Sequence, residues 1–240
     1  MSIKEFKALF PKALAQSLSH LKTSLKFGGP FLLAVFLGSF LLNAFAQSLM
    51  TGVMNQTYII AICIMVVSDM LASFLFLIVL PARIQDVRSR RPLRNVMTLT
   101  KSYGGDMAAE MLRVARGMLF GLLMGIIPGI LRSLRWILVP YVVVADPQYA
   151  KGERDALEHS ASLSKGLLMG MALLWLAFFF IDMGLYQVDQ AWWNLQKADS
   201  VIAWGGSIMI NFISTLATIY SILVYFAIYE VRQAAQGDKK

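Results

Sequence analysis

Residues 57–81 read TYIIAICIMVVSDMLASFLFLIVLP, and this run decides the fold class. Its only charged residue is Asp69, and about 20 predominantly apolar residues in a helix are long enough to cross the hydrocarbon core of a bilayer. Because lipid offers the backbone no hydrogen-bonding partner, such a segment crosses as a helix. The run therefore predicts a transmembrane span over 57–80, which Pro81 is expected to end.

The composition of the whole chain agrees with this reading. Of its 240 residues, 58% are hydrophobic and 15% are charged, whereas a soluble domain carries about 25% charged residues. The net charge of +8 comes mainly from polar segments between apolar runs, where the positive-inside rule places basic residues. We therefore expect anionic membrane lipids as partners and no nucleic acid.

Four further apolar runs cover residues 27–50, 117–145, 166–186 and 201–229. The third run is flanked by the basic segments 82–116 and 146–165, which the positive-inside rule places on the same side of the membrane. We therefore expect this run to turn back at Pro128-Gly129 as a helical hairpin, with arms near 106–127 and 130–145. The second arm is short, so a re-entrant hairpin is as compatible as a double crossing.

The expected fold is all-α: a polytopic membrane helical bundle of about six helical segments, including the Pro-Gly hairpin. Both termini are then cytoplasmic, and the location is a bacterial inner membrane. The alternative is a five-span chain with its termini on opposite sides. The single transmembrane domain covers 27–230, and 231–240 form a cytoplasmic tail.

The first 26 residues are predicted to form an amphipathic helix. Apolar residues recur every three or four positions, and lysines supply much of the polar remainder. Basic charge beside an apolar stripe favours a helix lying in the membrane interface; the alternative is a helix packed on the protein's own cytoplasmic loops. Pro11 is expected to break or restart this helix.

Asp69 is the residue whose placement in the bilayer is expected to cost the most free energy. An aspartate at the bilayer centre costs about 2.5–3.5 kcal/mol, so it must face protein or water, or be protonated. Two readings stay open: a proton or substrate relay, and a buried hydrogen bond to another helix. Four side chains are candidate partners: Asn43, Asn211, Arg132 and Arg135.

Arg132 and Arg135 are three residues apart and share a helix face. We hypothesise that Asp69 pairs with one of them, and the three residues together form the candidate intramembrane polar site. Asp182 is expected one turn from the outer end of its span, where it reaches the interface. Tyr186, Trp192 and Trp193 are typical of an outer aromatic belt.

Glycines recur every four residues through the third apolar run, at Gly117, Gly121, Gly125 and Gly129. A stripe of this kind on one helix face lets another backbone approach closely. The partner is either an internal helix or a second subunit, and internal packing is the preferred reading.

Motifs of catalysis or cofactor binding are not recognisable. No phosphate-binding loop, dinucleotide fingerprint or G-x-S-x-G pattern is present. His20 and His159 are isolated from each other, and a metal site needs three or four ligands. We expect both histidines to be solvated or capping residues, and we expect no catalytic residue, no metal and no cofactor.

A longer pattern appears between residues 127 and 166. It consists of Ile127-Pro128-Gly129-Ile130, Arg135, Pro140-Tyr141-Val142-Val143-Val144-Ala145-Asp146, Ala156-Leu157, Ser160, Leu163 and Lys165-Gly166. This stretch resembles the YciC-type family of small bacterial inner-membrane proteins. It also resembles the membrane domain fused to some glycerophosphoryl diester phosphodiesterases. The resemblance implies an integral membrane protein without established catalytic residues, and the chain carries no phosphodiesterase domain.

The leading hypothesis on function is a non-enzymatic scaffold or subunit of an envelope assembly. It rests on the amphipathic N-terminal segment, the glycine stripe and the basic segment 82–116. A protein partner or a second copy of the chain would bind there. The alternative is a transporter or lipid-handling protein that uses Asp69 with Arg132 and Arg135.

Overall fold

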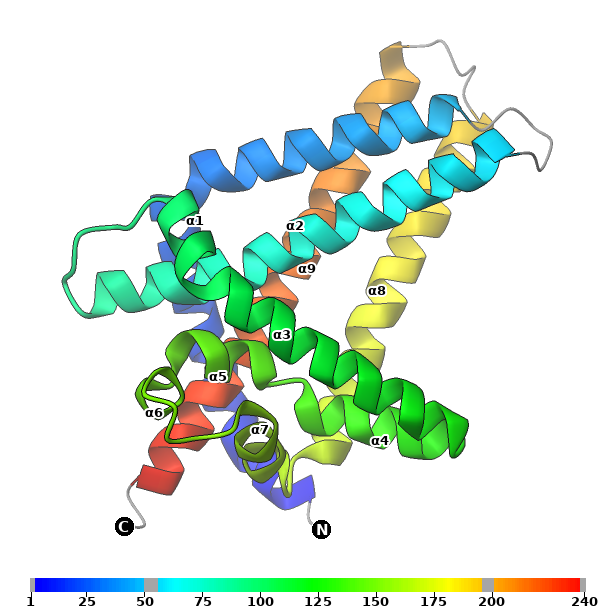
Figure 1. The fold of residues 1–240 in the computed structure, drawn as a ribbon. Helices are drawn as coiled ribbons and strands as arrows, with labels where there is room; N and C mark the ends of the chain where they lie inside the picture. Colours follow the sequence, from blue (N-terminus) through cyan, green and yellow to red (C-terminus); the bar gives the residue numbers. More distant parts are fainter. Residues whose placement is uncertain (1–2, 50–55, 196–200, 238–240) are drawn as a thin grey trace.

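The computed structural model describes residues 3–49, 56–195 and 201–237, and every element within these ranges is helical (Figure 1). The all-α prediction is thereby confirmed. The helices are α1 (Ile3–Ser48), α2 (Gln56–Arg88), α3 (Val96–Leu123), α4 (Ile126–Trp136), α5 (Val139–Ala145), α6 (Pro147–Ala150), α7 (Ala156–Ser164), α8 (Leu168–Leu195) and α9 (Val201–Gly237).

Five stretches of the described chain are long and apolar enough to cross a membrane. They are Phe6–Ala46, Ile59–Arg88, Ile126–Ala145, Leu168–Trp192 and Val201–Gln236. The chain is thus built as a multi-pass membrane protein. The first arm predicted for the hairpin, 106–127, lies mostly in α3, which is not among the five, so the predicted count of six stays a prediction.

The buried core lies in one part of the molecule, which we call the head. Its centre is α5, whose residues Val139–Val144 are all buried. The second halves of α2 and α9 pack around it, with α3 and α7 alongside. Fully or almost fully buried side chains from these surrounding helices include Phe76, Ile78, Leu99, Met107, Leu163, Leu223 and Phe226. The head therefore holds together by ordinary apolar packing.

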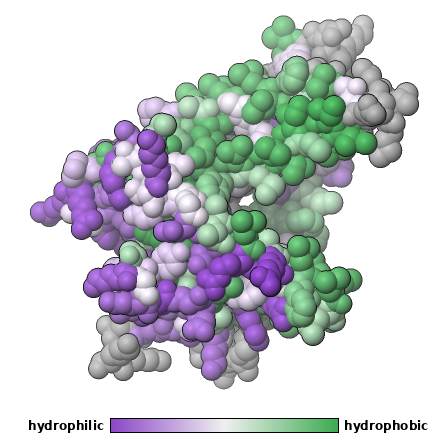
Figure 2. Space-filling model, viewed as in Figure 1, coloured by the Kyte–Doolittle hydropathy of each residue, from purple (hydrophilic) through white to green (hydrophobic). Residues whose placement is uncertain are grey.

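The remaining helical surface is apolar and uncovered. In Figure 2 hydrophobic residues cover the upper and right-hand parts, whereas hydrophilic residues gather over the head at lower left. Exposed large apolar side chains lie on the second half of α1, the first half of α2, the α3–α4 tip, α8 and the first half of α9. Exposed apolar side chains along helices of this length are typical of a surface that faces lipid.

The long helices run past three prolines. α1 continues through Pro11 and Pro30, and α2 continues through Pro81. The expected break at Pro11 and the expected end at Pro81 are therefore wrong. Each proline removes a backbone hydrogen bond, but Leu80 and Ala82 beside Pro81 are buried in the head, so packing outweighs the loss.

The N-terminal segment 1–26 is not a separate interfacial helix, because its described part is the first half of α1. Every third or fourth residue of this half is buried, at Leu9, Ala13, Ser17, His20 and Ser24, and α1 packs along α9. The segment therefore has a protein partner. α1 changes direction between its dark-blue and lighter-blue parts (Figure 1), as Gly28-Gly29-Pro30 allows.

The hairpin region differs from prediction in its boundaries. α3 begins at Val96, because the Asn95 side chain accepts a hydrogen bond from the Thr98 amide at 2.7 Å and caps the helix. The turn between α3 and α4 lies at Met124-Gly125, where Gly125 has φ 133°. Pro128 sits in the first turn of α4, where a proline is tolerated.

The last two long helices also exceed their predicted spans. α8 continues to Leu195, so Asp182 lies midway along it and is not close to its end. α9 continues to Gly237 and takes in most of the predicted tail at 231–240. The extension of α8 matters for the site, because it brings Asp182 and Asp189 onto one continuous helix.

Candidate functional site

A cavity of about 540 Å³ lies between α1, α2, α8 and α9. Three carboxylates line it, those of Asp69, Asp182 and Asp189. All three belong to apolar stretches long enough to cross a membrane. We call this space, with its three aspartates, the acidic cavity.

Asp69 is held from the neighbouring helix α1. Its Oδ1 atom accepts hydrogen bonds from the Asn43 amide at 3.1 Å and from the Ser39 hydroxyl at 3.3 Å. Ser68, next to it, donates to Ser39 at 3.2 Å. Asn43, one of the four predicted partners of Asp69, therefore does form a hydrogen bond with it.

Asp182 and Asp189 face α9. The Asp182 Oδ1 atom accepts from the Ser214 hydroxyl at 2.9 Å. The Asp189 Oδ2 atom lies 3.5 Å from the Asn211 amide nitrogen, and Asn211 makes a shorter bond of 2.9 Å to the Ser207 carbonyl. Asp189 is therefore the more weakly satisfied of the two carboxylates.

Asp189 is also the exception among the buried acids. Four acidic side chains are buried in the described part of the chain: Asp86, Glu110, Asp146 and Asp189. The first three each pair with an arginine, at 2.7–2.8 Å. Asp189 is 6% exposed, has no such ion pair among the described residues, and its Oδ1 atom is buried without a hydrogen-bond donor.

The sign of the charge in the acidic cavity is uniform. None of the described lining residues is a lysine, an arginine or a histidine. The neutral donors that reach the carboxylates are hydroxyls and amides, which satisfy single lone pairs but neutralise no charge. The ionisable side chains among the described lining residues are therefore all acidic.

The expected pairing of Asp69 with an arginine is wrong. Arg132 donates to the Gly117 carbonyl at 3.1 Å and lies over the Phe120 ring, 5.5 Å from its centroid. Arg135 is exposed, and its carbonyl accepts from Ser160 at 2.8 Å. Both arginines belong to the α3–α4 pair, so the sequence grouped residues that the fold separates.

The four glycines of the predicted stripe serve the contact between α3 and α4, although they do not lie on one helix. Gly117 and Gly121 belong to α3, Gly125 forms the turn and Gly129 belongs to α4. A Cβ on Gly121 would lie 3.0 Å from the Gly129 Cα, and one on Gly117 would overlap the Trp136 ring. Of the two alternatives, the structure places the stripe in internal packing.

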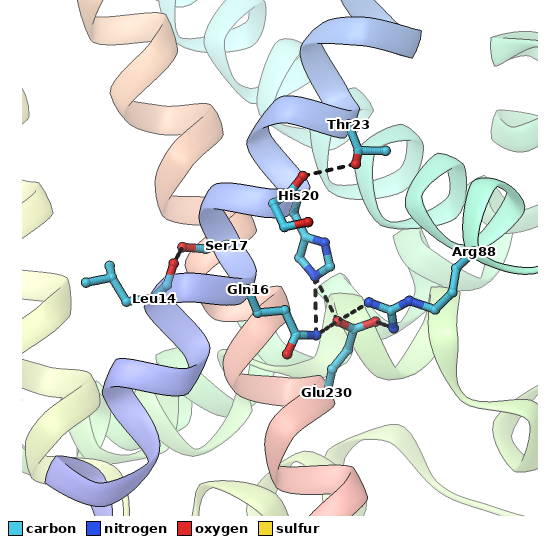
Figure 3. A network of polar contacts seen from close by, with 8 residues as sticks. Leu14, Gln16, Ser17, His20, Thr23, Arg88 and Glu230 are labelled. Carbon is cyan, nitrogen blue, oxygen red and sulfur yellow. Dashed lines mark hydrogen bonds and ion pairs between the residues drawn. The ribbon is translucent and has the colours of Figure 1, made fainter.

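At the head, a single carboxylate joins three long helices (Figure 3). Glu230 of α9 accepts from Arg88 of α2 at 2.6 Å and lies 2.8 Å from the Nε2 atom of His20 of α1. Gln16 of α1 donates to the same carboxylate. His20 is 3% exposed, so the expectation that it is solvated is wrong.

His159 is likewise buried. Its Nε2 atom lies 3.1 Å from Arg154 Nη1 and 3.4 Å from Asp146 Oδ2. Burial lowers the pKa of His159, as does the charge of Arg154, and Asp146 only partly opposes them. The neutral imidazole can accept a hydrogen bond from Arg154, so His159 acts as a structural acceptor.

The neighbouring helix start at Asp155 adds a second anchor to the head. Asp155 accepts from the backbone amides of Leu157 and Glu158 and pairs with Arg113 at 2.7 Å. Arg113 also pairs with Glu110, and burial together with Glu110 raises the pKa of Tyr149 to about 12. These contacts stabilise the head and use the charges of Arg113, Glu110 and Asp155.

Sequence reasoning missed two of the three acidic residues. Asp182 is predicted to reach the interface, and Asp189 lies between the predicted spans 166–186 and 201–229. The available signal is their spacing, because residues seven apart lie on the same helix face. That signal becomes visible only once one helix is known to continue to Leu195.

Comparison with protein-family models, with curated proteins and with solved structures finds no match for this chain. The resemblance to the YciC-type family therefore stays a prediction, and the candidate site is interpreted from its own geometry.

Proposed function

We propose that the chain is a multi-pass protein of a bacterial inner membrane that binds a small cation in the acidic cavity and passes it across the membrane. One observation carries the proposal. Asp69, Asp182 and Asp189 line a cavity between membrane-crossing helices, and none of its described lining residues is basic.

The energetics support a ligand. A carboxylate at the centre of a span costs about 2.5–3.5 kcal/mol on insertion scales. Asp69 and Asp182 are exposed on the apolar helices, whereas Asp189 is buried, and a buried charge is tolerated when it is paired, hydrated or protonated. Among the described residues, the donors that reach these carboxylates are neutral. They join neighbouring helices but leave the charges unneutralised, and a bound cation would supply the counter-charge.

Two of the features that motivated the scaffold hypothesis also have roles within the chain itself. The glycine stripe is used between α3 and α4. Several arginines of the basic segment pair with acids of the same chain, as Arg88, Arg94 and Arg113 do. The transport alternative still uses Asp69, but the residues beside it are now Asp182 and Asp189 and no longer the two arginines.

The placement of the chain ends favours an even number of crossings. α1 begins and α9 ends at the same end of the molecule (Figure 1), whereas five crossings would put them on opposite sides. The stretch Ile126–Ala145 is the one that is interrupted, between Trp136 and Val139, and its α5 part is buried in the head. We therefore propose four crossings, by α1, α2, α8 and α9, with α3–α4 entering the bilayer and returning.

The orientation then follows from charge. The head carries most of the basic residues, so the positive-inside rule places it in the cytoplasm with both chain ends. A reporter fused after Asp146 should give a cytoplasmic signal. A periplasmic signal would mean that Ile126–Ala145 crosses and that this arrangement is wrong.

Transport is tested with the purified full chain in liposomes. Uptake of radiolabelled K⁺ and of a labelled organic ammonium salt is measured under an imposed negative inside potential. At least one cation should enter faster than into protein-free liposomes, and Asp189→Asn should reduce that rate. Asp106→Asn, the same change at an exposed site on α3, should not. Equal rates in all four preparations would refute the proposal.

A further inference from the structure

We infer that the cation taken by the acidic cavity is a protonated organic amine with an apolar body, and not a metal ion. This inference rests on the proposed function and names its ligand class. It uses three independent features of the cavity: the spacing of its acids, the type of polar atom left without a partner, and the nature of its walls.

The spacing of the acids does not suit a metal. Among the described residues, no group of three or more histidines, cysteines or acids lies close enough to hold a metal ion. Asp182 and Asp189 are seven residues apart on α8, which is about 10.5 Å along the helix. Calcium and magnesium need six or more oxygens within about 2.6 Å of one point. A volume of about 540 Å³ lies instead in the range of sites for small organic ligands.

The polar atoms left over call for a hydrogen-bond donor. Two side-chain atoms among the described lining residues are buried without a partner, Oδ1 of Asp189 and Oδ1 of Asn43. Both are acceptors, so each of these two atoms lacks a donor. An ammonium group that still carries N–H satisfies such acceptors and neutralises a carboxylate with a charge-assisted hydrogen bond. A quaternary ammonium group supplies the charge but no donor.

The walls fit the carbon skeleton of such a ligand. Phe36, Phe40 and Phe76 line the cavity together with aliphatic side chains. Phe36 is fixed by stacking on Phe40 and by an edge contact with Phe212. Aromatic faces attract ammonium groups, and apolar walls bury the alkyl or aryl part. A hydrated inorganic ion would gain nothing from these contacts.

The test is a binding titration of the full chain in mild detergent with monodansylcadaverine, a fluorescent primary amine. Its N-acetyl derivative, which has no charge, is the ligand control, and protein-free micelles give the background. The amine should bind at least 10-fold more tightly than the acetylated compound. Asp189→Asn should weaken amine binding about 10- to 100-fold, and Asp106→Asn should leave it unchanged. If Asp189→Asn does not purify as a monodisperse species, Asp182→Asn takes its place.

The outcomes separate this inference from the proposed function. Equal binding of the amine and the acetylated compound would overturn the inference, because binding would then depend on apolar contacts and not on the ammonium charge. Binding of K⁺ or Mg²⁺ is measured separately by calorimetry. If the amine does not bind but K⁺ or Mg²⁺ binds saturably and depends on Asp189, the inference about the ligand is overturned and the proposal of cation transport still stands. Failure of every cation to bind would overturn both.

Discussion

Replacement of Gly121 by alanine tests whether α3 and α4 form a close backbone contact. The added Cβ would lie 3.0 Å from the Gly129 Cα and 3.2 Å from its nitrogen, where ordinary contacts begin at 3.4 Å. Because the neighbouring atoms are backbone, the two helices must move apart by a few tenths of an ångström. Overpacking of this kind costs about 1–3 kcal/mol.

The matched control is Gly105→Ala on the same helix, since nothing lies within 4 Å of a Cβ there. It measures the gain in helix propensity alone, up to about 1 kcal/mol. We expect the unfolding temperature of Gly121→Ala to be lower than that of Gly105→Ala, by roughly 2–4 °C for each kcal/mol of destabilisation. Circular dichroism in detergent measures both temperatures. If Gly121→Ala unfolds at the same temperature as Gly105→Ala or above it, the close contact does not exist.

Three further predictions concern the head. Glu230→Gln should destabilise the protein by about 1–3 kcal/mol, because Glu230 joins α9 to Arg88 and to α1; chemical unfolding measures it, and no loss would contradict the network. Burial lowers the pKa of His159, so the unfolded chain binds its proton first and stability should fall as the pH drops below about 6.5. His159→Gln should flatten the change in unfolding temperature between pH 7.5 and 5.5, and an unchanged slope would refute this. Arg90 has φ 52° at the end of α2, so Arg90→Gly should stabilise by about 0.5–1 kcal/mol and Ser89→Gly should not, as thermal unfolding of both would show.

The membrane class and the positions of the apolar runs were predictable from the sequence, because hydropathy depends on residue type alone. The helix ends were not. Pro81 signals an end by local rules, but α2 continues to Arg88 because the residues around Pro81 are buried by α5 and α9. Burial of this kind comes from tertiary contacts, which no local pattern carries.

The candidate site was predictable only in part, for a related reason. Asp69 stood out because it is a lone charge in an apolar run, whereas Asp189 lies among polar residues that read as a connection. Its partners depend on which helices become neighbours. α3 and α4 turn at Gly125 and keep Arg132 on Gly117, so the arginine expected beside Asp69 is used elsewhere.

The contrast between the two charged regions is the strongest argument that the acidic cavity has a ligand. The chain has 22 lysines and arginines against 14 acids, so basic residues are not scarce. In the head, Asp86, Glu110 and Asp146 are buried and each has an arginine. Asp189 is buried to the same degree, and among the described residues its polar contact is a distant amide, that of Asn211 at 3.5 Å. A buried charge without a counter-charge destabilises the fold, and the same chain offsets that cost at every other buried acid the structure describes. The described residues give Asp189 no counter-charge, and the proposed cation would supply it.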